Sequence, residues 1–260
     1  MTTVLCVPQW QGSAAKSARQ LVVGATRSAE ALQLGTVVTV PVVEGALEIT
    51  DGIRAYGALV ENVRLTGELL AGIDDFVITV GGDCGVEVAP IEAARQRYGD
   101  ELRVLWIDAH ADCYGPNDLR SGAFHGMVVR TLLGDGPALL TPHHPLNPEQ
   151  LVHAGLRVAA DVEREFIRTT GVRGYGVDDL ERAADGLDGP TYVHIDLDVL
   201  DPAEFGSVGY PEPGGVPAQR LIEFVAGLGN VVGAGITEHA PSTDNANETA
   251  IIHNLGRALS

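Results

Sequence analysis

The chain is poor in cysteine and has no long apolar run. Its three cysteines, Cys6, Cys84 and Cys113, are too few and too scattered for a disulfide framework, which fits a reducing compartment. No apolar stretch approaches the roughly 18 residues that a membrane span needs. The N-terminus has neither a basic region before an apolar segment nor a small-residue cleavage site. We therefore expect a soluble, cytoplasmic protein.

Positive charge is also scarce. The 260 residues contain 17 Lys and Arg against 35 Asp and Glu, which gives a formal net charge of −18 at pH 7. This balance argues against binding to nucleic-acid backbones and to anionic membrane surfaces. It favours cationic small molecules such as guanidinium and amine compounds through long-range attraction, although an acidic balance is also common in proteins that are merely soluble.

Strand-like and helix-like segments alternate along the whole chain, and no linker, repeat or low-complexity tract divides it. We therefore expect a single domain over residues 1–260, with a doubly wound parallel sheet. The almost continuously β-branched segment 36–43 predicts a strand buried on both faces, and Ser13 is expected to cap the first helix. The predicted strands are 4–10, 36–43, 76–80, 103–108, 151–156, 192–200 and 231–237, and the predicted helices are 14–34, 55–70, 86–98, 127–133, 161–170, 218–228 and 248–259.

Carboxylate, imidazole and carboxylate alternate where the segment 103–108 ends. Asp108, His110 and Asp112 would share one face of an extended strand, with the outer two about 13 Å apart at about 3.3 Å per residue. One ion with bonds of about 2 Å cannot gather all three. Either the strand ends and the chain curls, or two ions share these ligands.

A second pair of carboxylates, Asp196 and Asp198, ends another apolar segment. In open parallel sheets, ligands bind at the carboxyl edge of the strands, so both groups of acids are expected there. A set of capping or solvated acids is the alternative. Four carboxylates balance the charge of two divalent ions, and oxygen ligands with an imidazole suit Mn²⁺ better than a thiolate-type structural zinc.

Four segments resemble the main motifs of the ureohydrolases, the family of arginase, agmatinase and their relatives. The segments are 108–112, 121–127, 194–202 and 235–241, and their order and spacing agree with the family from about residue 75 to the C-terminus. The resemblance implies a three-layer α/β/α fold with a mainly parallel, roughly eight-stranded sheet, and a trimer or hexamer.

The resemblance also implies a centre of two manganese ions. In it Asp108 and Asp196 bridge the ions, His110 and Asp198 bind one ion, and Asp112 binds the other and belongs to the reacting centre. Water activated by the two ions would attack the guanidinium carbon.

The family's other motif residues carry predictions for the substrate. The resemblance implies that His125 shuttles a proton to the leaving amine or relays solvent, and that Glu238 accepts hydrogen bonds from the guanidinium. Ser121 is retained among the substrate-binding positions. Tyr114 stands where arginases carry an asparagine, and Glu163 lies in a segment that resembles a further substrate-binding motif.

Departures from the family pattern lie close to these residues. Ala123 replaces a second asparagine, and Ala160 stands where an acid that binds the α-amino group is expected. Cys84 occupies the position of a histidine ligand of one manganese. It is either a soft thiolate ligand, a neutral thiol that scarcely ligates, or an inert buried residue, and in each case that ion should bind more weakly. With a cysteine at this position, the chain resembles the branch of the family that includes Nω-hydroxy-arginine amidinohydrolase.

The sequence thus predicts a metal-dependent hydrolase of linear guanidino compounds such as arginine, hydroxy-arginine or agmatine, which releases an amine and urea or a urea analogue. Two alternatives remain open. One is a deacetylase-like amide hydrolase with a single zinc ion, and the other is a degenerate homologue that binds a guanidino ligand without turnover.

Overall fold

Eight parallel strands form one sheet in the order β2-β1-β5-β10-β9-β6-β7-β8. The computed structural model describes residues 1–260. A separate antiparallel hairpin of two short strands, β3 and β4, lies outside this sheet. The strands are β1 (Thr2–Val7), β2 (Thr36–Thr39), β3 (Ile49–Thr50), β4 (Ile53–Arg54), β5 (Phe76–Gly81), β6 (Arg103–Ile107), β7 (Leu151–Ala154), β8 (Arg173–Tyr175), β9 (Thr191–Asp196) and β10 (Val231–Thr237).

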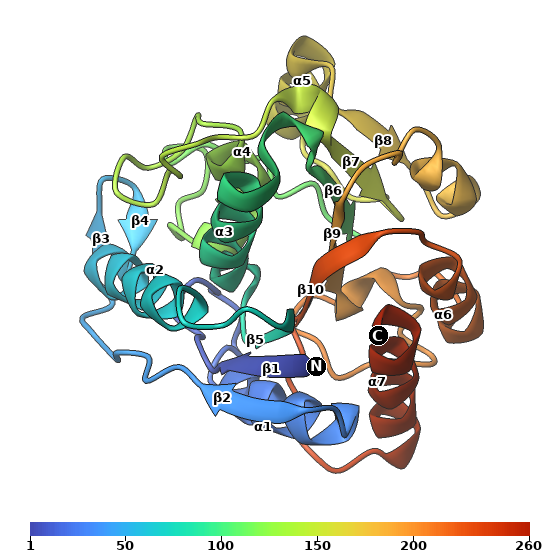
Figure 1. Ribbon diagram of the computed structural model, residues 1–260. Coiled ribbons are helices and arrows are strands. Elements are labelled where there is room, and N and C mark those ends of the chain that lie inside the picture. Colours follow the sequence, from blue (N-terminus) through green and yellow to red (C-terminus); the bar gives the residue numbers. More distant parts are fainter.

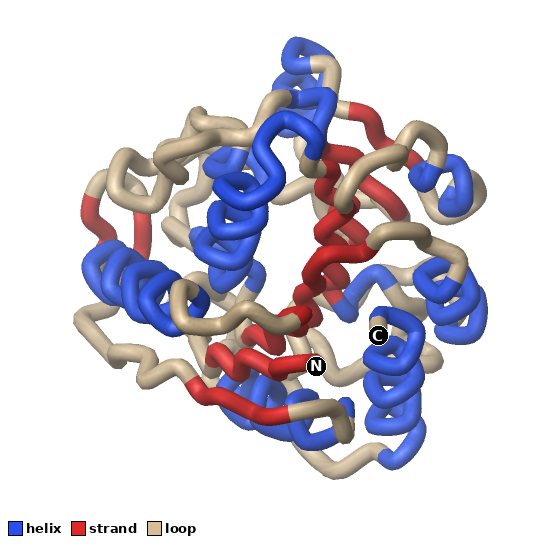
Figure 2. Tube along the Cα trace, viewed as in Figure 1, coloured by secondary structure: helices blue, strands red, loops and turns tan.

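Helices cover both faces of the sheet, as Figures 1 and 2 show. Helices α1, α6 and α7 pack on one face, and α2, α3 and α4 on the other. The predicted three-layer α/β/α fold is therefore confirmed. None of the helices combines the length and apolar character that crossing a bilayer requires. The helices are α1 (Gln20–Leu32), α2 (Tyr56–Leu70), α3 (Val88–Tyr98), α4 (Val128–Leu132), α5 (Asp161–Thr170), α6 (Ala218–Ala226) and α7 (Ala246–Leu259).

Strand β6 shows how the sequence builds these two layers. Its successive side chains point to opposite faces, so Leu105 and Ile107 join the core beneath α1, α6 and α7. Val104 and Trp106 join the core beneath α2, α3 and α4. All four side chains are fully buried, as expected for a parallel strand covered on both faces. Asp108, which follows the strand, continues the row of Trp106 on the α3 side.

Two sequence predictions about the N-terminal region are wrong. Strand β2 covers only Thr36–Thr39 and forms the edge of the sheet, where three of its four residues are exposed, so it is not buried on both faces. Its β-branched residues satisfy strand propensity without being buried. Helix α1 begins at Gln20, because the chain forms turns over 16–19, and Ser13 therefore caps no helix. The short strand β8 and the hairpin β3-β4 were not predicted.

Candidate metal centre and active site

The carboxyl ends of four adjacent strands, β5, β10, β9 and β6, carry the polar residues of the site. Cys84 lies just after β5, and Glu238 directly after β10. Asp196 ends β9, and Asp108 follows β6. Because parallel strands run in the same direction, these ends meet at one edge of the sheet and bring together segments that are far apart in the sequence.

The acid cluster, which we define as Asp108, His110, Asp112, Asp196 and Asp198, forms where β6 and β9 end. Strand β6 ends at Ile107, so Asp108, His110 and Asp112 lie in the loop after it and do not share one face of an extended strand. His110 Nδ1 lies 3.0 Å from Asp198 Oδ2 and 3.6 Å from Asp108 Oδ1. Asp112 adopts a left-handed backbone with φ of 52°. The chain therefore curls, which resolves the separation of about 13 Å that an extended strand would impose.

Local hydrogen bonds orient the carboxylates of Asp108 and Asp196. Trp106 Nε1 donates to Asp108 Oδ2 at 3.0 Å, and the His110 backbone N–H donates to Asp108 Oδ1 at 2.6 Å. The Asp198 backbone N–H donates to Asp196 Oδ1 at 2.8 Å. Both side chains are therefore fixed by groups only two residues away, before any ligand is considered.

Cys84 points its sulfur at the acid cluster. Its Sγ lies 3.1 Å from Asp196 Oδ2 and 3.3 Å from Thr237 Oγ1, and the residue is 1% exposed. Burial, with the nearby carboxylates of Asp196 and Glu238, raises the pKa of the Cys84 thiol well above its usual value. Without a cation the group is therefore a thiol that donates to Asp196. Ligation of a metal by Cys84 stays a prediction.

His110 is the only ion-pair partner of the acid cluster, to Asp108 and Asp198, and Asp112 and Asp196 form no ion pair. Burial, reinforced by neighbouring carboxylates, raises the pKa values of Asp112 and Asp196 well above their usual range. Asp112 Oδ2 is buried and has no hydrogen-bond partner. Buried charges of one sign are costly unless cations neutralise them. The donors therefore fit divalent cations.

Three sets of side chains place their ligand atoms within 4.8 Å of one another. One is Asp108, His110 and Asp198, which matches part of the predicted centre. The other two contain Cys84, and Asp112 belongs to none of them. The sets with Cys84 are Cys84, Asp196 and Glu238, and Cys84, Asp108 and His194.

A pair formed by His125 and Glu238 lies beside the acid cluster. His125 Nδ1 is 3.3 Å from Glu238 Oε1, which also accepts the Cys84 backbone N–H at 3.2 Å. Glu238 Oε2 is buried without a partner, and the residue has a left-handed φ of 65°. Burial favours the neutral imidazole of His125, but the Glu238 carboxylate outweighs it and raises the pKa of His125.

The remaining substrate-side predictions concern Ser121 and Tyr114, which lie in loops, and Glu163, which lies in α5. Ser121 is exposed, and its Oγ accepts the Ala123 backbone N–H at 3.3 Å. Tyr114 is partly buried. Glu163 Oε1 accepts the Cys113 backbone N–H at 3.0 Å, and Oε2 accepts that of Ala160 at 2.8 Å. Glu163 thus ties the start of α5 to the metal-ligand loop, and its role in substrate binding stays a prediction.

Three residues near the site were not singled out from the sequence. Tyr210 stacks on His125 with ring centroids 5.3 Å apart, and Glu212 Oε1 lies 3.8 Å from His110 Nε2. Both come from the loop 201–217, whose Pro and Gly residues indicated only a loop. His194 stands two residues before Asp196 in a strand, and this spacing on one face was the available signal.

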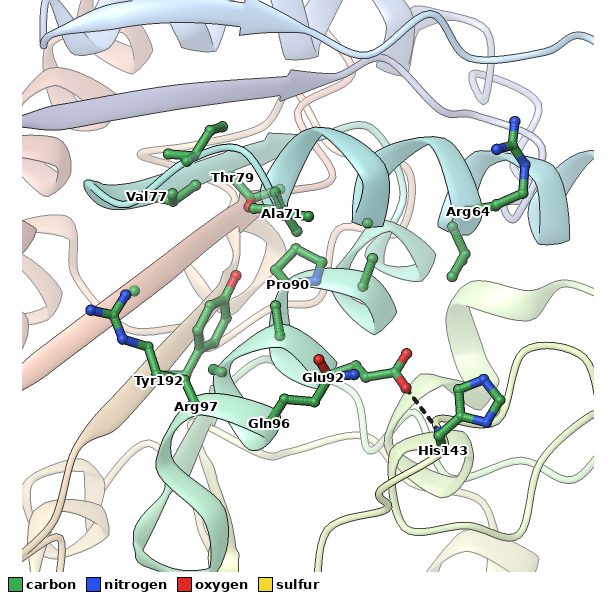
Figure 3. Close-up of a pocket in the computed structure, with 18 of the residues that line it drawn as sticks. Arg64, Ala71, Val77, Thr79, Pro90, Glu92, Gln96, Arg97, His143 and Tyr192 are labelled. Carbon is green, nitrogen blue, oxygen red and sulfur yellow. Dashed lines mark hydrogen bonds between the residues drawn. The ribbon is translucent and has the colours of Figure 1, made fainter.

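A cavity of about 730 Å³ lies away from the acid cluster, between α2, α3 and the sheet. Figure 3 shows Arg64 of α2, Pro90 of α3 and Tyr192 of β9 around it. No residue of the acid cluster lines this cavity. Its size therefore says nothing about the candidate active site.

Comparisons with known proteins agree with this arrangement. A family model described as "Arginase family" matches residues 18–255. An arginase of Coccidioides posadasii is 31% identical over 200 residues, which cover 66% of this chain and 62% of that protein. An arginase of Staphylococcus aureus is 28% identical over 222 residues, which cover 77% of this chain and 73% of that protein. The chain thus aligns with less than two thirds of the fungal relative's length.

Solved structures share the fold. An arginase from Bacillus subtilis superposes with a TM-score of 0.85 at 22% identity and covers 100% of this chain and 98% of its own. The proclavaminate amidino hydrolase of Streptomyces clavuligerus gives a TM-score of 0.73 at 21% identity, and the superposition covers 99% of this chain and 90% of that chain.

Proposed function

Because the chain belongs to the arginase family, we propose that it is a metal-dependent amidinohydrolase. It would hydrolyse a linear guanidino or N-substituted guanidino compound to an amine and urea or a urea analogue. The observation that carries this proposal is the acid cluster with the His125–Glu238 pair beside it, at the carboxyl edge of four adjacent strands.

The proposed cofactor is a pair of Mn²⁺ ions. Asp108, His110 and Asp198 would hold one ion. Asp112 and Asp196 would hold the other with Cys84, and Asp108 and Asp196 would be shared between both ions. Bound divalent ions supply Lewis acidity, which makes water a nucleophile near neutral pH. Four carboxylates match the charge of two such ions, which supports the number proposed.

Glu238 would bind and orient the guanidinium group. The residue is only 2% exposed, and its Oε2 atom is buried without a hydrogen-bond partner. A carboxylate is the natural acceptor for a planar guanidinium, and a hydrogen bond between charged groups is stronger than one between neutral groups. The Cys84 backbone N–H donates to Oε1 and helps to fix the side chain in place.

His125 would move a proton to the leaving amine. Glu238 contacts its Nδ1 and favours the protonated imidazole, so the proton on Nε2 is the one available for transfer. The Tyr210 ring stacks on His125 and limits its rotation and its exposure to water. Imidazole suits this step because its pKa lies near neutral pH.

The substrate class follows from the positions at which this chain differs from arginases. Asparagine and acid positions that arginases use for the amino-acid head group are Tyr114, Ala123 and Ala160 here. Substrates without an α-amino-acid head group, or with a modified guanidino group, are therefore included in the proposal. The net charge of −18 favours cationic substrates at long range.

The test is a substrate panel with the Mn²⁺-loaded protein. Release of urea or hydroxyurea is measured with arginine, hydroxy-arginine, agmatine, guanidinobutyrate and formiminoglutamate. We expect turnover of at least one compound, and loss of that turnover in Asp196→Asn but not in Asp188→Asn, which alters an exposed aspartate. No turnover of any compound by fully loaded protein would refute the proposal, and cleavage of an acetylated amine with one bound zinc would favour the deacetylase-like alternative.

Further parts of the proposal concern the organisation of the protein. The chain would form one ureohydrolase-like domain, act in the cytoplasm and assemble as a trimer or hexamer. Light scattering coupled to size-exclusion chromatography measures the assembly directly. A monomer at micromolar concentration would contradict the oligomer.

A further inference from the structure

A buried histidine and glutamate lie directly beneath the acid cluster and are not used by the proposed reaction. His194 and Glu87 are both 0% exposed. Both oxygens of Glu87 and the Nδ1 atom of His194 have no hydrogen-bond partner. Buried polar groups are nearly always satisfied, so two adjacent residues that are not satisfied need an explanation.

The backbone holds His194 next to the cysteine. Trp106 and His194 are register partners on β6 and β9, and their rings stack with centroids 3.6 Å apart. This stacking points His194 Nε2 toward Cys84, whose Sγ lies 3.7 Å away. The ligand atoms of Cys84, His194 and Asp108 all lie within 4.8 Å of one another, a spacing that a single ion can bridge.

Glu87 lies on the opposite side of the same ring. Its Oε2 is 3.9 Å from His194 Nδ1, just beyond hydrogen-bond distance. Gly235 of β10 leaves the room for this carboxyl group, because a Cβ atom there would lie 1.9 Å from Glu87 Oε1. A carboxylate behind the second nitrogen of an imidazole is the usual arrangement when the first nitrogen binds a metal.

We propose that His194 is a metal ligand, and that with Cys84 and Asp108 it forms an inner ion position selective for a softer ion such as Zn²⁺ or Co²⁺. In this arrangement Nε2 binds the ion, and Nδ1–H donates to Glu87. The inference deepens the proposed function because it concerns the same metal centre, and it rests on that function only for the identity of the second ion.

The donor chemistry separates the two positions. Sulfur and imidazole nitrogen favour Zn²⁺ and Co²⁺, whereas the oxygen-rich set of Asp108, His110 and Asp198 is compatible with Mn²⁺. His194 thereby supplies, from β9, the imidazole that Cys84 does not supply after β5. With Mn²⁺ alone both positions would take Mn²⁺, as in the proposed pair, whereas with both metals present the position next to Cys84 would take the softer ion.

The experiment uses Co²⁺ as a spectroscopic probe on the metal-free full chain. An imidazole bound to Co²⁺ gives a strongly shifted proton resonance from its other nitrogen, and this signal disappears in heavy water. We expect such a resonance from His194 together with thiolate-to-cobalt charge-transfer absorption. His194→Phe, which keeps an aromatic ring to stack on Trp106, should lose the resonance and weaken binding at the inner position at least about tenfold. His253→Phe, a variant of a histidine on α7, should retain both signals.

Glu87→Gln keeps the test decisive if His194→Phe does not fold. It should weaken Co²⁺ binding by about 10- to 100-fold and change the chemical shift of the His194 N–H resonance, as loss of a carboxylate behind a metal-bound imidazole does in general. Unchanged affinity and an unchanged shift in Glu87→Gln, or an unchanged set of shifted resonances in His194→Phe, would overturn the inference.

Metal analysis provides a second readout. With one equivalent of Zn²⁺ and an excess of Mn²⁺, we expect one zinc and one manganese ion per chain, whereas manganese in both positions would overturn the inference. A protein that shows the His194 resonance but hydrolyses no guanidino compound would refute the proposed function and leave this inference standing. Turnover of a guanidino compound without the His194 resonance would refute this inference and leave the proposed function standing.

Discussion

Replacing Glu238 by glutamine tests how the substrate is held, because the change removes one charge and keeps the shape. The carboxylate has one oxygen occupied by the Cys84 backbone N–H and near His125, and one buried oxygen that is free for the guanidinium. A hydrogen bond to a charged group contributes about 1.5–3 kcal/mol. Glu238→Gln should therefore lower kcat/KM by about 10- to 150-fold, since about 1.4 kcal/mol corresponds to a factor of ten.

The same variant should change the pH dependence. Glu238 raises the pKa of His125 against the effect of burial, so His125 stays protonated to higher pH in the native protein. If the imidazolium donates the proton, activity is present below this pKa and is lost as the pH rises through it. In Glu238→Gln the pKa of His125 falls, and the decline in kcat/KM at high pH should move to lower pH.

The assay is urea release with the best substrate of the panel, measured over a pH series at saturating metal. Glu248→Gln is the matched control, because Glu248 is also 2% exposed and also accepts backbone N–H groups but is not part of the acid cluster. Its pH profile should match that of the native protein. A Glu238→Gln variant with native kcat/KM and a native pH profile would refute the assigned role of Glu238.

Three further variants probe the groups around the site. Cys84→His should raise Mn²⁺ occupancy and shift activity toward arginine-like substrates, as measured by metal analysis and the panel, and unchanged metal content would place Cys84 outside the ligand set. Trp106→Phe removes the donor to Asp108 Oδ2 and should weaken metal binding by about 10- to 100-fold in a competition titration, whereas native affinity would contradict the orienting role. Arg157→Met removes donors to the carbonyls of Asp198 and Glu212, so the loop that carries Tyr210 should loosen and KM should rise more than kcat falls. An unchanged KM would show that this loop does not contact substrate.

The layers of the fold could be predicted from the sequence because alternation of strands and helices leaves few arrangements. The convergence of Asp108 and Asp196 also follows from this logic, since both stand at the carboxyl ends of parallel strands. Edge strands are harder to predict, because a β-branched segment such as β2 has the same sequence pattern at the edge of a sheet as at its centre. The start of α1 was misplaced since the residues before Gln20 have helix-compatible composition but form turns.

The contacts across the site could not be predicted in the same way. Tyr210 reaches His125 from an irregular loop, whose path no periodicity describes. His194 and Glu87 approach each other through the register of β9 and the space left by Gly235, and both are tertiary properties. Sequence patterns therefore located the strand ends, while side-chain packing decided which residues face the acid cluster.

The most direct test of the account measures bound metal and guanidino hydrolysis in the same titration. Metal-free protein is reconstituted stepwise with Mn²⁺, with and without one equivalent of Zn²⁺, and the release of urea or its analogue is followed at each step. We expect turnover to rise with occupancy of the acid cluster and to be absent in Asp196→Asn. Full occupancy without hydrolysis of any guanidino compound, or equal rates in Asp196→Asn, would contradict it.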